Sequence, residues 1–163
     1  MVADKETFLQ LLEENKGIIF SICRSYCTEK EDIDDLAQEI IYNLWKAFTN
    51  YTPTSCKFTT WMYRVALNVA ISFYRKEIRS LQFNAFSEDL IVYDDDFERS
   101  TESDQRLNLL YQFIHGLNEI DKSIMLLYLD DKSYKEIADI VGITETNVAT
   151  KINRIKKKMK SKF

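Results

Sequence analysis

The chain has 163 residues, 45% of them hydrophobic and 13% aromatic, which is enough to bury the core of one ordinary domain or of two small ones. Only three glycines and one proline are present, which argues against a fold rich in strands and turns and predicts an all-α chain. The formal net charge of −4, taken alone, argues weakly against a nucleic-acid partner.

Two helices are predicted in the first fifty residues. The first covers residues 5–27, and Gly17 weakens it near its middle. Its apolar stripe consists of Phe8, Leu11, Leu12, Ile18, Ile19 and Ile22. The second covers residues 31–48 and starts with acids that suit a helix N-terminus. Its stripe consists of Ile33, Leu36, Ala37, Ile40, Leu44 and Ala47, and Pro53 then interrupts a loop over residues 49–57.

A third helix is predicted over residues 59–79, with two distinct faces. The apolar face consists of Met62, Val65, Ala66, Val69 and Phe73. The other face is polar, aromatic and basic, and consists of Trp61, Arg64, Asn68, Ser72 and Arg75. Interleaved aromatic and basic residues suit single-stranded nucleic acid, since bases stack on rings and phosphates meet cations. The same pattern also fits a helix whose aromatic residues belong to the core.

Residues 81–103 lose this periodicity and are rich in acids, serine and threonine. They predict a flexible linker with a short helical piece near Leu90. The linker separates a module of residues 1–80 from a module of residues 104–163. Two small helical domains, a three-helix bundle and a four-helix domain, are therefore expected.

The second module predicts a helix-turn-helix. Helices over residues 104–116 and 118–129 precede Ser133, which forms a capping box with Glu136. Gly142 suits a left-handed helix stop, and Thr144 caps a last helix that runs to about residue 160. A short helix, a turn with glycine and a second helix make up this motif.

The last helix is strongly basic. Residues 151–162 carry seven lysines and arginines and no acid. Its predicted outer face can reach base edges or phosphates, and consists of Thr146, Asn147, Thr150, Lys151 and Arg154. The lysines of residues 156–160 can neutralise further phosphates. A plain amphipathic hairpin with a soluble tail is the alternative reading.

The remaining signals concern location and cofactors. The cysteines Cys23, Cys27 and Cys56 are odd in number and irregularly spaced, so free thiols in a reduced compartment are expected, with no metal and no cofactor. No apolar run approaches the ~20 residues that span a bilayer, and residues 1–7 do not resemble a signal peptide. A cytoplasmic location is expected.

Two segments resemble a known family. DIDDLAQEIIYNLWKAF (residues 32–48), followed by KFTTWMYRVALNVAISFYRKE (residues 57–77), resembles region 2 of the extracytoplasmic-function sigma factors, which belong to the sigma-70 family. SYKEIADIVGITETNVATKINRIKKKM (residues 133–159) resembles their region 4. The two segments stand in the family's order and together cover nearly the whole chain.

The resemblance implies a role for each of three faces. Residues that would bind the clamp helices of core RNA polymerase are Asp35, Gln38, Glu39, Asn43 and Trp45. Residues that would hold the melted −10 element are Phe58, Trp61, Arg64, Asn68, Ser72, Arg75 and Lys76. Residues that would contact the duplex −35 element are Thr144, Thr146, Asn147, Thr150, Lys151, Arg154 and Lys157. By spacing alone, the polymerase-binding residues fit a solvated helix face, and only the resemblance assigns them.

Two positions depart from the family pattern. Thr59 and Lys151 stand where arginine is usual, and lysine lacks the planar fork that arginine offers to guanine or phosphate. The departures bear on which promoter is read, while the role stays the same.

A sigma factor that gives promoter specificity, with no enzymatic activity, is therefore the leading hypothesis. Its acidic net charge would keep the free subunit off DNA, and an anti-sigma factor is an expected partner. The alternative is a stand-alone helix-turn-helix regulator whose N-terminal module senses a ligand or partner. A protein that antagonises a sigma factor by mimicry would not need the basic last helix. An enzyme fits least, because no phosphate loop, metal cluster or paired nucleophile is apparent.

Overall fold

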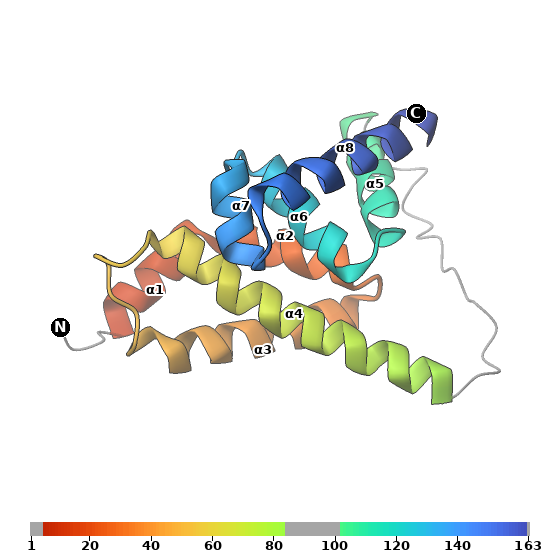
Figure 1. Cartoon of the computed structure of the whole chain (residues 1–163). Coiled ribbons are helices and arrows are strands. Elements are labelled where there is room, and N and C mark those ends of the chain that lie inside the picture. The colour runs from red at the N-terminus through yellow and green to blue at the C-terminus, as the bar shows by residue number, and fades with distance from the viewer. Residues whose placement is uncertain (1–4, 84–101, 163) are drawn as a thin grey trace.

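The computed structural model describes residues 5–83 and 102–162, and within them it contains α-helices and no β-strand (Figure 1). This confirms the all-α prediction. The N-terminal helices are α1 (Lys5–Glu14), α2 (Lys16–Tyr26), α3 (Lys30–Phe48) and α4 (Phe58–Phe83). The C-terminal helices are α5 (Glu102–His115), α6 (Glu119–Leu129), α7 (Tyr134–Val141) and α8 (Glu145–Lys162).

The prediction of one helix over residues 5–27 is wrong, because the chain breaks at Asn15 between α1 and α2. The Asn15 side chain donates a 2.8 Å hydrogen bond to the Leu11 carbonyl, and asparagine competes with helical backbone pairing in this way. Gly17, two residues further on, has a low helix propensity and further weakens the helix at this point. The bend lets Phe8 of α1 pack against Trp45 and Phe48 of α3, with ring centroids 5.1 and 5.2 Å apart.

The buried stripes of α3 and α4 form the centre of the N-terminal module. On α3 the buried residues are Leu36, Ile40 and Leu44 of the predicted stripe, together with Phe48, which the stripe did not include. The other predicted residues, Ile33, Ala37 and Ala47, are only partly buried. On α4 the buried face is rotated from the predicted one and consists of Met62, Tyr63, Ala66, Leu67 and Ala70. Val65, Val69 and Phe73 are only partly buried. The rotation has a tertiary cause, since α4 packs on α2 and α3 and also on α6 and α7.

The C-terminal module confirms the predicted local signals. Ser133 and Glu136 form the capping box at the start of α7, and Gly142 ends that helix with a left-handed φ of 84°. Thr144 Oγ1 accepts a 3.1 Å hydrogen bond from the Asn147 amide and so caps α8. Ala138 and Val148 are buried where α7 crosses α8. The helix-turn-helix is therefore present.

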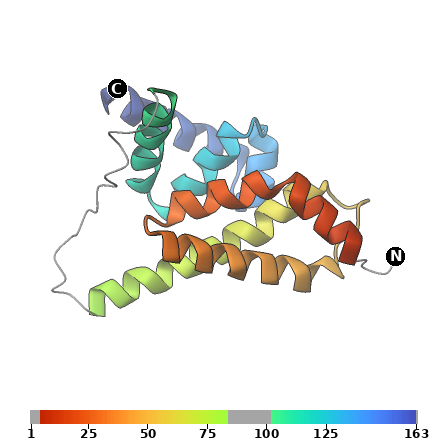
Figure 2. The same ribbon diagram turned by 180° about the vertical axis from the view of Figure 1, so that it is seen from behind.

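The boundaries between the modules differ slightly from the prediction. α4 continues to Phe83 and α5 begins at Glu102, so helices occupy both ends of the predicted linker. The helical piece expected near Leu90 lies outside the described residues. Figure 1 and Figure 2 show the C-terminal half of α4 projecting beyond the other helices, while α2 lies beside the C-terminal module. None of the described helices is long and apolar enough to cross a membrane.

Candidate polymerase-binding and nucleic-acid interfaces

The predicted polymerase-binding face lies on α3. Asp35, Gln38 and Glu39 are exposed, and their spacing places them on one side of the helix. Asn43 is partly buried and donates a 2.8 Å hydrogen bond to the Glu39 carbonyl of its own helix. Trp45 is 41% exposed although its ring also packs on Phe8. The acid and amide groups of this face are thus free for a partner, and Asn43 lies at its edge.

An apolar groove, which the sequence did not predict, adjoins this face. It has a volume of about 500 Å³ and is lined by Lys5, Phe8, Leu9, Gln38, Ile41, Tyr42 and Trp45. Leu9 and Tyr42 are among the exposed large hydrophobic residues, at 49% and 59%. The only sequence signal was apolar residues at positions off the predicted stripes. Gln38 and Trp45 belong both to the groove and to the predicted face, so the two surfaces are continuous.

A carboxylate cluster lies at the N-terminal end of α3. Partial burial and then the nearby Asp32, Glu29 and Asp35 raise the pKa of Glu77 on α4. The shift reports negative potential at this end of the face. A basic or hydrogen-bond-donating partner surface would therefore be favoured there.

The predicted −10 face runs along α4. Arg64, Asn68, Ser72 and Arg75 are exposed, and their three- and four-residue steps align them on one side. Lys76 is exposed at the edge of that side. Arg75 is engaged within the protein, because its Nε and Nη2 donate hydrogen bonds of 2.9 and 2.6 Å to Glu119 Oε1. The structure thus leaves Arg64, Asn68, Ser72 and Lys76 without such a bond to the other module.

Phe58 and Trp61 begin this helix as members of an aromatic cluster. Their centroids lie 5.5 Å apart, and Tyr51 of the preceding loop lies 5.8 Å from Phe58 and 5.0 Å from Trp61. Phe48 of α3 completes the cluster at 6.0 Å from Trp61. All but Phe48 are partly exposed, so the rings combine core packing with surface available for stacking.

The predicted −35 face lies on α8. Thr146, Asn147, Thr150 and Arg154 are exposed, opposite the buried Val148, Ile152 and Ile155. Thr144 is exposed at the N-cap and Lys157 one turn beyond Arg154. The helix therefore presents a polar and basic surface along one side while its other side closes the core.

Lys151 is the exception on α8. It is half-buried, and its Nζ lies 3.5 Å from Asp121 Oδ1 on α6. That oxygen is buried and has no hydrogen bond, so the ammonium is its nearest electrostatic partner. Lys151 thus lies at the border between the exposed face and the core. Its contact with Asp121 positions the side chain and does not leave the ammonium free to bind a phosphate.

The thiols and carboxylates give no sign of a metal centre. Cys23 and Cys27 are buried and Cys56 partly so, all as free cysteines. Burial raises the pKa of both Cys23 and Cys27 to about 12, so these thiols stay protonated. Among the described residues, no group of histidine, cysteine and carboxylate side chains is arranged to hold a metal ion.

Family models match both modules. The model of sigma-70 region 2 matches residues 11–80, and that of sigma-70 region 4 matches residues 107–159. Together they cover most of the chain, in the order expected. The chain belongs to the sigma-70 family, in its extracytoplasmic-function group.

Curated relatives agree with this membership. The sigma factor is 26% identical over 161 residues to the ECF RNA polymerase sigma factor SigW of Bacillus subtilis, covering 93% of this chain and 86% of that one. It is 25% identical over 170 residues to the ECF RNA polymerase sigma-E factor of Haemophilus influenzae, covering 98% and 89%. The protein is an RNA polymerase sigma factor, and the stand-alone regulator is not favoured.

The fold also has a solved neighbour. The structure of CnrH in complex with the cytosolic domain of CnrY matches with a TM-score of 0.69 at 19% identity, over 97% of this chain and 88% of that one. The likeness extends over both modules. At this identity it shows a shared fold.

Proposed function

We propose that this sigma factor acts as a promoter-reading subunit without enzymatic activity, which docks on core polymerase through α3 and contacts the promoter at two points. In this division, residues 1–80 bind polymerase and the −10 element, and residues 104–163 bind the −35 element. The observation that carries the proposal is the separation of three exposed polar faces, on α3, α4 and α8. The protein would work where polymerase works, in the cytoplasm.

The α3 face is proposed to bind the polymerase. Asp35, Gln38 and Glu39 supply acceptors and a donor, and the adjoining groove with Trp45 supplies apolar area. Such a mixture of an aromatic anchor and a polar rim is usual for protein interfaces. Reversing the charge of Glu39 is expected to weaken polymerase binding at least tenfold, which corresponds to ~1.4 kcal/mol.

The α4 and α8 faces are proposed to bind DNA in different forms. On α4, the exposed Arg64 and Asn68 lie on the same helix as Trp61, which suits unpaired bases that stack and hydrogen-bond. On α8, Asn147 and Arg154 lie on the outer side of a helix-turn-helix recognition helix, which suits the major groove. Binding at both points stabilises melted DNA, and thereby shifts the equilibrium from closed to open complex without chemistry.

The test distinguishes binding to the polymerase from recognition of the promoter. Core polymerase is mixed with each variant, and binding is measured alongside run-off transcription from fragmented genomic DNA of the source organism. We expect Arg64→Ala and Arg154→Ala to reduce specific transcripts about tenfold, from ~1–3 kcal/mol per contact, with polymerase affinity unchanged. Glu39→Lys is expected to lose polymerase affinity itself.

Matched controls lie on α5. Arg106→Ala and Glu102→Lys change exposed charges that pair with each other at 3.0 Å within α5, so transcription should stay at the wild-type level. Loss of polymerase binding in Arg64→Ala and Arg154→Ala would contradict the division of labour. An equal loss in the α5 controls would show that charge alone, and no particular face, matters.

An anti-sigma factor is proposed as a further partner. CnrH, which shares the fold, is solved in complex with the cytosolic domain of CnrY, and this supports an inhibitor of comparable mode here. An inhibitor that holds the two modules together would cover their polymerase-facing sides. Purification of the chain from its own cells should bring down a protein that suppresses transcription with core polymerase. Failure of every co-purifying protein to suppress transcription would count against this partner.

A further inference from the structure

An ion pair between Asp121 and Lys151 joins α6 to the DNA-facing helix α8. The Lys151 Nζ lies 3.5 Å from Asp121 Oδ1, and the two side chains are 32% and 13% exposed. Among the described residues, no group donates a hydrogen bond to this buried oxygen. The ammonium of Lys151 is therefore what compensates the charge of the Asp121 carboxylate.

The carboxylate of Asp121 is held in place by the cap of its own helix. Asn118 Nδ2 donates a 3.1 Å hydrogen bond to Asp121 Oδ2, while the Asp121 amide donates a 2.8 Å hydrogen bond to Asn118 Oδ1. The first bond engages one carboxylate oxygen and leaves the other beside Lys151. Rotating the carboxylate out to water would break that bond.

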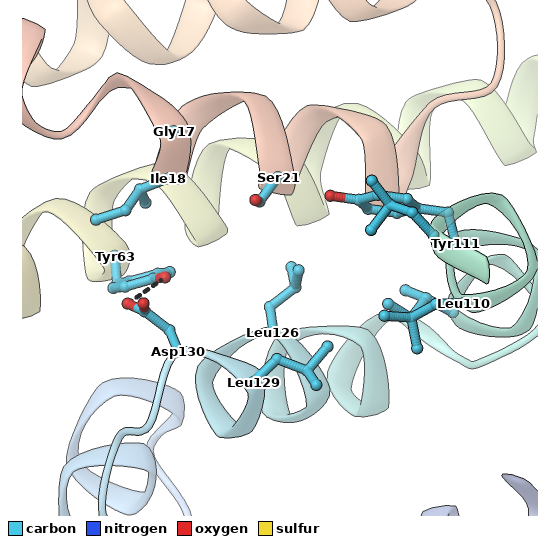
Figure 3. A pocket seen from close by; sticks show the side chains of 11 residues that line it. Gly17, Ile18, Ser21, Tyr63, Leu110, Tyr111, Leu126, Leu129 and Asp130 are labelled. Carbon is cyan, nitrogen blue, oxygen red and sulfur yellow. Dashed lines mark hydrogen bonds between the residues drawn. The ribbon is translucent and has the colours of Figure 1, made fainter. Parts of the chain in front are cut away.

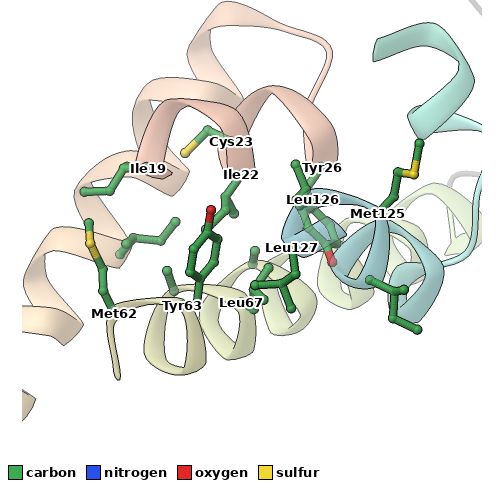
Figure 4. Packing of buried hydrophobic residues seen from close by; sticks show 14 of the residues in the cluster. Ile19, Ile22, Cys23, Tyr26, Met62, Tyr63, Leu67, Met125, Leu126 and Leu127 are labelled. Atoms are coloured by element: carbon green, nitrogen blue, oxygen red, sulfur yellow. The ribbon is translucent and has the colours of Figure 1, made fainter. Parts of the chain in front are cut away.

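The helix that carries Asp121 is fixed in the core. Buried residues of α6 that pack in one cluster with α2 and α4 include Met125, Leu126 and Leu127 (Figure 4). Lys122, the neighbour of Asp121, is 1% exposed, and its Nζ lies 4.2 Å from the ring centroid of Tyr74 and 5.2 Å from that of Tyr26. Asp121 is thus a negative charge at a fixed place next to α8.

Asp130, at the other end of α6, is a contrasting case. Its side chain is exposed, and its carboxylate accepts a hydrogen bond from the Tyr63 hydroxyl (Figure 3). A carboxylate that is hydrated and hydrogen-bonded does not depend on a nearby cation. Asp121 does depend on one, and that cation comes from the helix proposed to bind DNA.

The pair keeps the charge of Lys151 from DNA in either position of the lysine side chain. An ammonium that stays beside Asp121 brings no net charge to a phosphate, because the carboxylate opposes it. An ammonium that turns outward leaves a buried carboxylate oxygen without a partner, which is strongly unfavourable. Lysine carries its charge on one compact group, so it cannot span both anions as the planar fork of arginine could.

Without this partner, Lys151 would be well placed to bind a phosphate. It lies one helical turn after Asn147 and about one turn before Arg154, and both of these residues are exposed on the outer side of α8. A cation at this position would strengthen binding to duplex DNA of any sequence, because phosphate contacts carry no base information.

We propose that Asp121 lowers the affinity of α8 for duplex DNA: as a positioning residue, it withholds the Lys151 ammonium from the phosphates of the −35 element. The inference rests on the proposed function of α8. It gives Lys151 a different role from the DNA contact predicted from the sequence, since the charge of Lys151 serves Asp121. Sequence reading is left to the exposed side chains of α8, which include Asn147 and Arg154.

The experiment measures how binding of core polymerase with the sigma factor to a duplex −35 fragment depends on salt. Asp121→Asn can keep the bond from Asn118 and frees Lys151. One new phosphate contact should steepen the slope of log K against log salt by ~0.9, so the gain in affinity over wild type should shrink ~3.5-fold between ~50 and ~200 mM salt.

Two further variants show whether the effect passes through Lys151. Asp130→Asn removes the same charge from the other end of α6 and should keep the wild-type slope. Adding Lys151→Met to Asp121→Asn should return the slope to the wild-type value, which a merely structural role of Asp121 would not produce. Circular dichroism checks that each variant keeps the helix content of wild type.

A wild-type slope in Asp121→Asn, or a steeper slope that persists in the double variant, would overturn the positioning role. An equal steepening in Asp130→Asn would also overturn it, since net charge alone would then explain the result. A double variant whose slope falls below the wild-type value would show that Lys151 already binds a phosphate. Wild-type complexes that bind a scrambled −35 fragment as tightly as the intact one would instead refute the proposed function of α8.

Discussion

The Tyr63 hydroxyl donates a 2.8 Å hydrogen bond to Asp130 Oδ2, so a buried residue of α4 is tied to the residue that ends α6. Burial, and next the hydrogen bond and charge of Asp130, raise the pKa of Tyr63 well above its usual range. The hydroxyl therefore keeps its proton and remains a donor at every working pH. The bond joins the two modules at the C-terminal end of α6, whereas the Arg75–Glu119 pair joins them at its N-terminal end.

Replacing Tyr63 with phenylalanine removes this bond and keeps the ring. We expect the free energy of unfolding of the full chain to fall by ~1 kcal/mol, since Asp130 is exposed and regains water. Urea unfolding followed by circular dichroism measures the change. An unchanged urea midpoint would mean that hydrogen bonds to water stabilise the Tyr63 hydroxyl and the Asp130 carboxylate as well as their mutual bond does.

His115 predicts a pH dependence of stability. Burial, and then the charge of Lys122, lower its pKa from 6.5 to about 4, whereas a backbone hydrogen bond to Arg24 opposes the shift. The unfolded chain takes up a proton near pH 6.5 and the folded chain only near pH 4, so stability is present above pH 6.5 and declines as the pH falls between these values. Partial exposure of the ring limits the loss to about 1–2 kcal/mol.

Comparing wild type with the His115→Gln variant isolates the contribution of His115 protonation to stability. Unfolding free energies measured from pH 7 to pH 4.5 should fall more steeply in wild type than in the variant. Lys122 stays charged in both states over this window, because its folded pKa is about 8. Parallel curves for the two proteins would show that His115 is protonated equally in the folded and unfolded chains.

The capping box of α7 predicts a local stability effect. Ser133 Oγ accepts a 3.1 Å hydrogen bond from the Glu136 amide, and its own amide donates to the Glu136 carboxylate at 3.4 Å. Ser133→Ala should cost ~1 kcal/mol of unfolding free energy. Ser161→Ala is the matched control, because Ser161 only donates to the Lys158 carbonyl near the end of α8. Equal effects of the two substitutions would be evidence against a capping role.

Lys157 predicts a change in salt dependence. If its exposed ammonium neutralises one phosphate, Lys157→Ala should reduce the slope of log K against log salt by ~0.9 for binding of the polymerase complex to duplex −35 DNA. Lys16→Ala on α2 also removes an exposed charge, away from α8, and should leave the slope unchanged. A slope that responds to neither variant would place Lys157 off the DNA.

Local signals in the sequence predicted local structure well. Ser133, Gly142 and Thr144 act within four residues of themselves, so the helix-turn-helix was predicted correctly from residue types alone. The break at Asn15 was missed because a stripe of apolar residues continues across it. Leu67 was not placed in the core and the burial of Tyr63 was left open, since both depend on α6 packing on the second side of α4.

The contacts between the modules could not be predicted in this way. Lys122 lies in a helix whose sequence gives no reason to bury a cation, and Tyr26 and Tyr74 are distant in the chain. The pair Arg75–Glu119 spans the segment that separates the modules. Such contacts depend on how two bodies dock, and periodicity within one helix carries no information about docking.

The most direct test of two-point promoter reading is a footprint of the open complex. Core polymerase, the sigma factor and a promoter fragment recovered from the run-off transcripts are combined and treated with permanganate and with DNase I. We expect unpaired thymines at the −10 element and protection at the −35 element, both only when polymerase and sigma factor are present together. Protection at −35 by the free chain, with no unpaired thymines in any mixture, would contradict it.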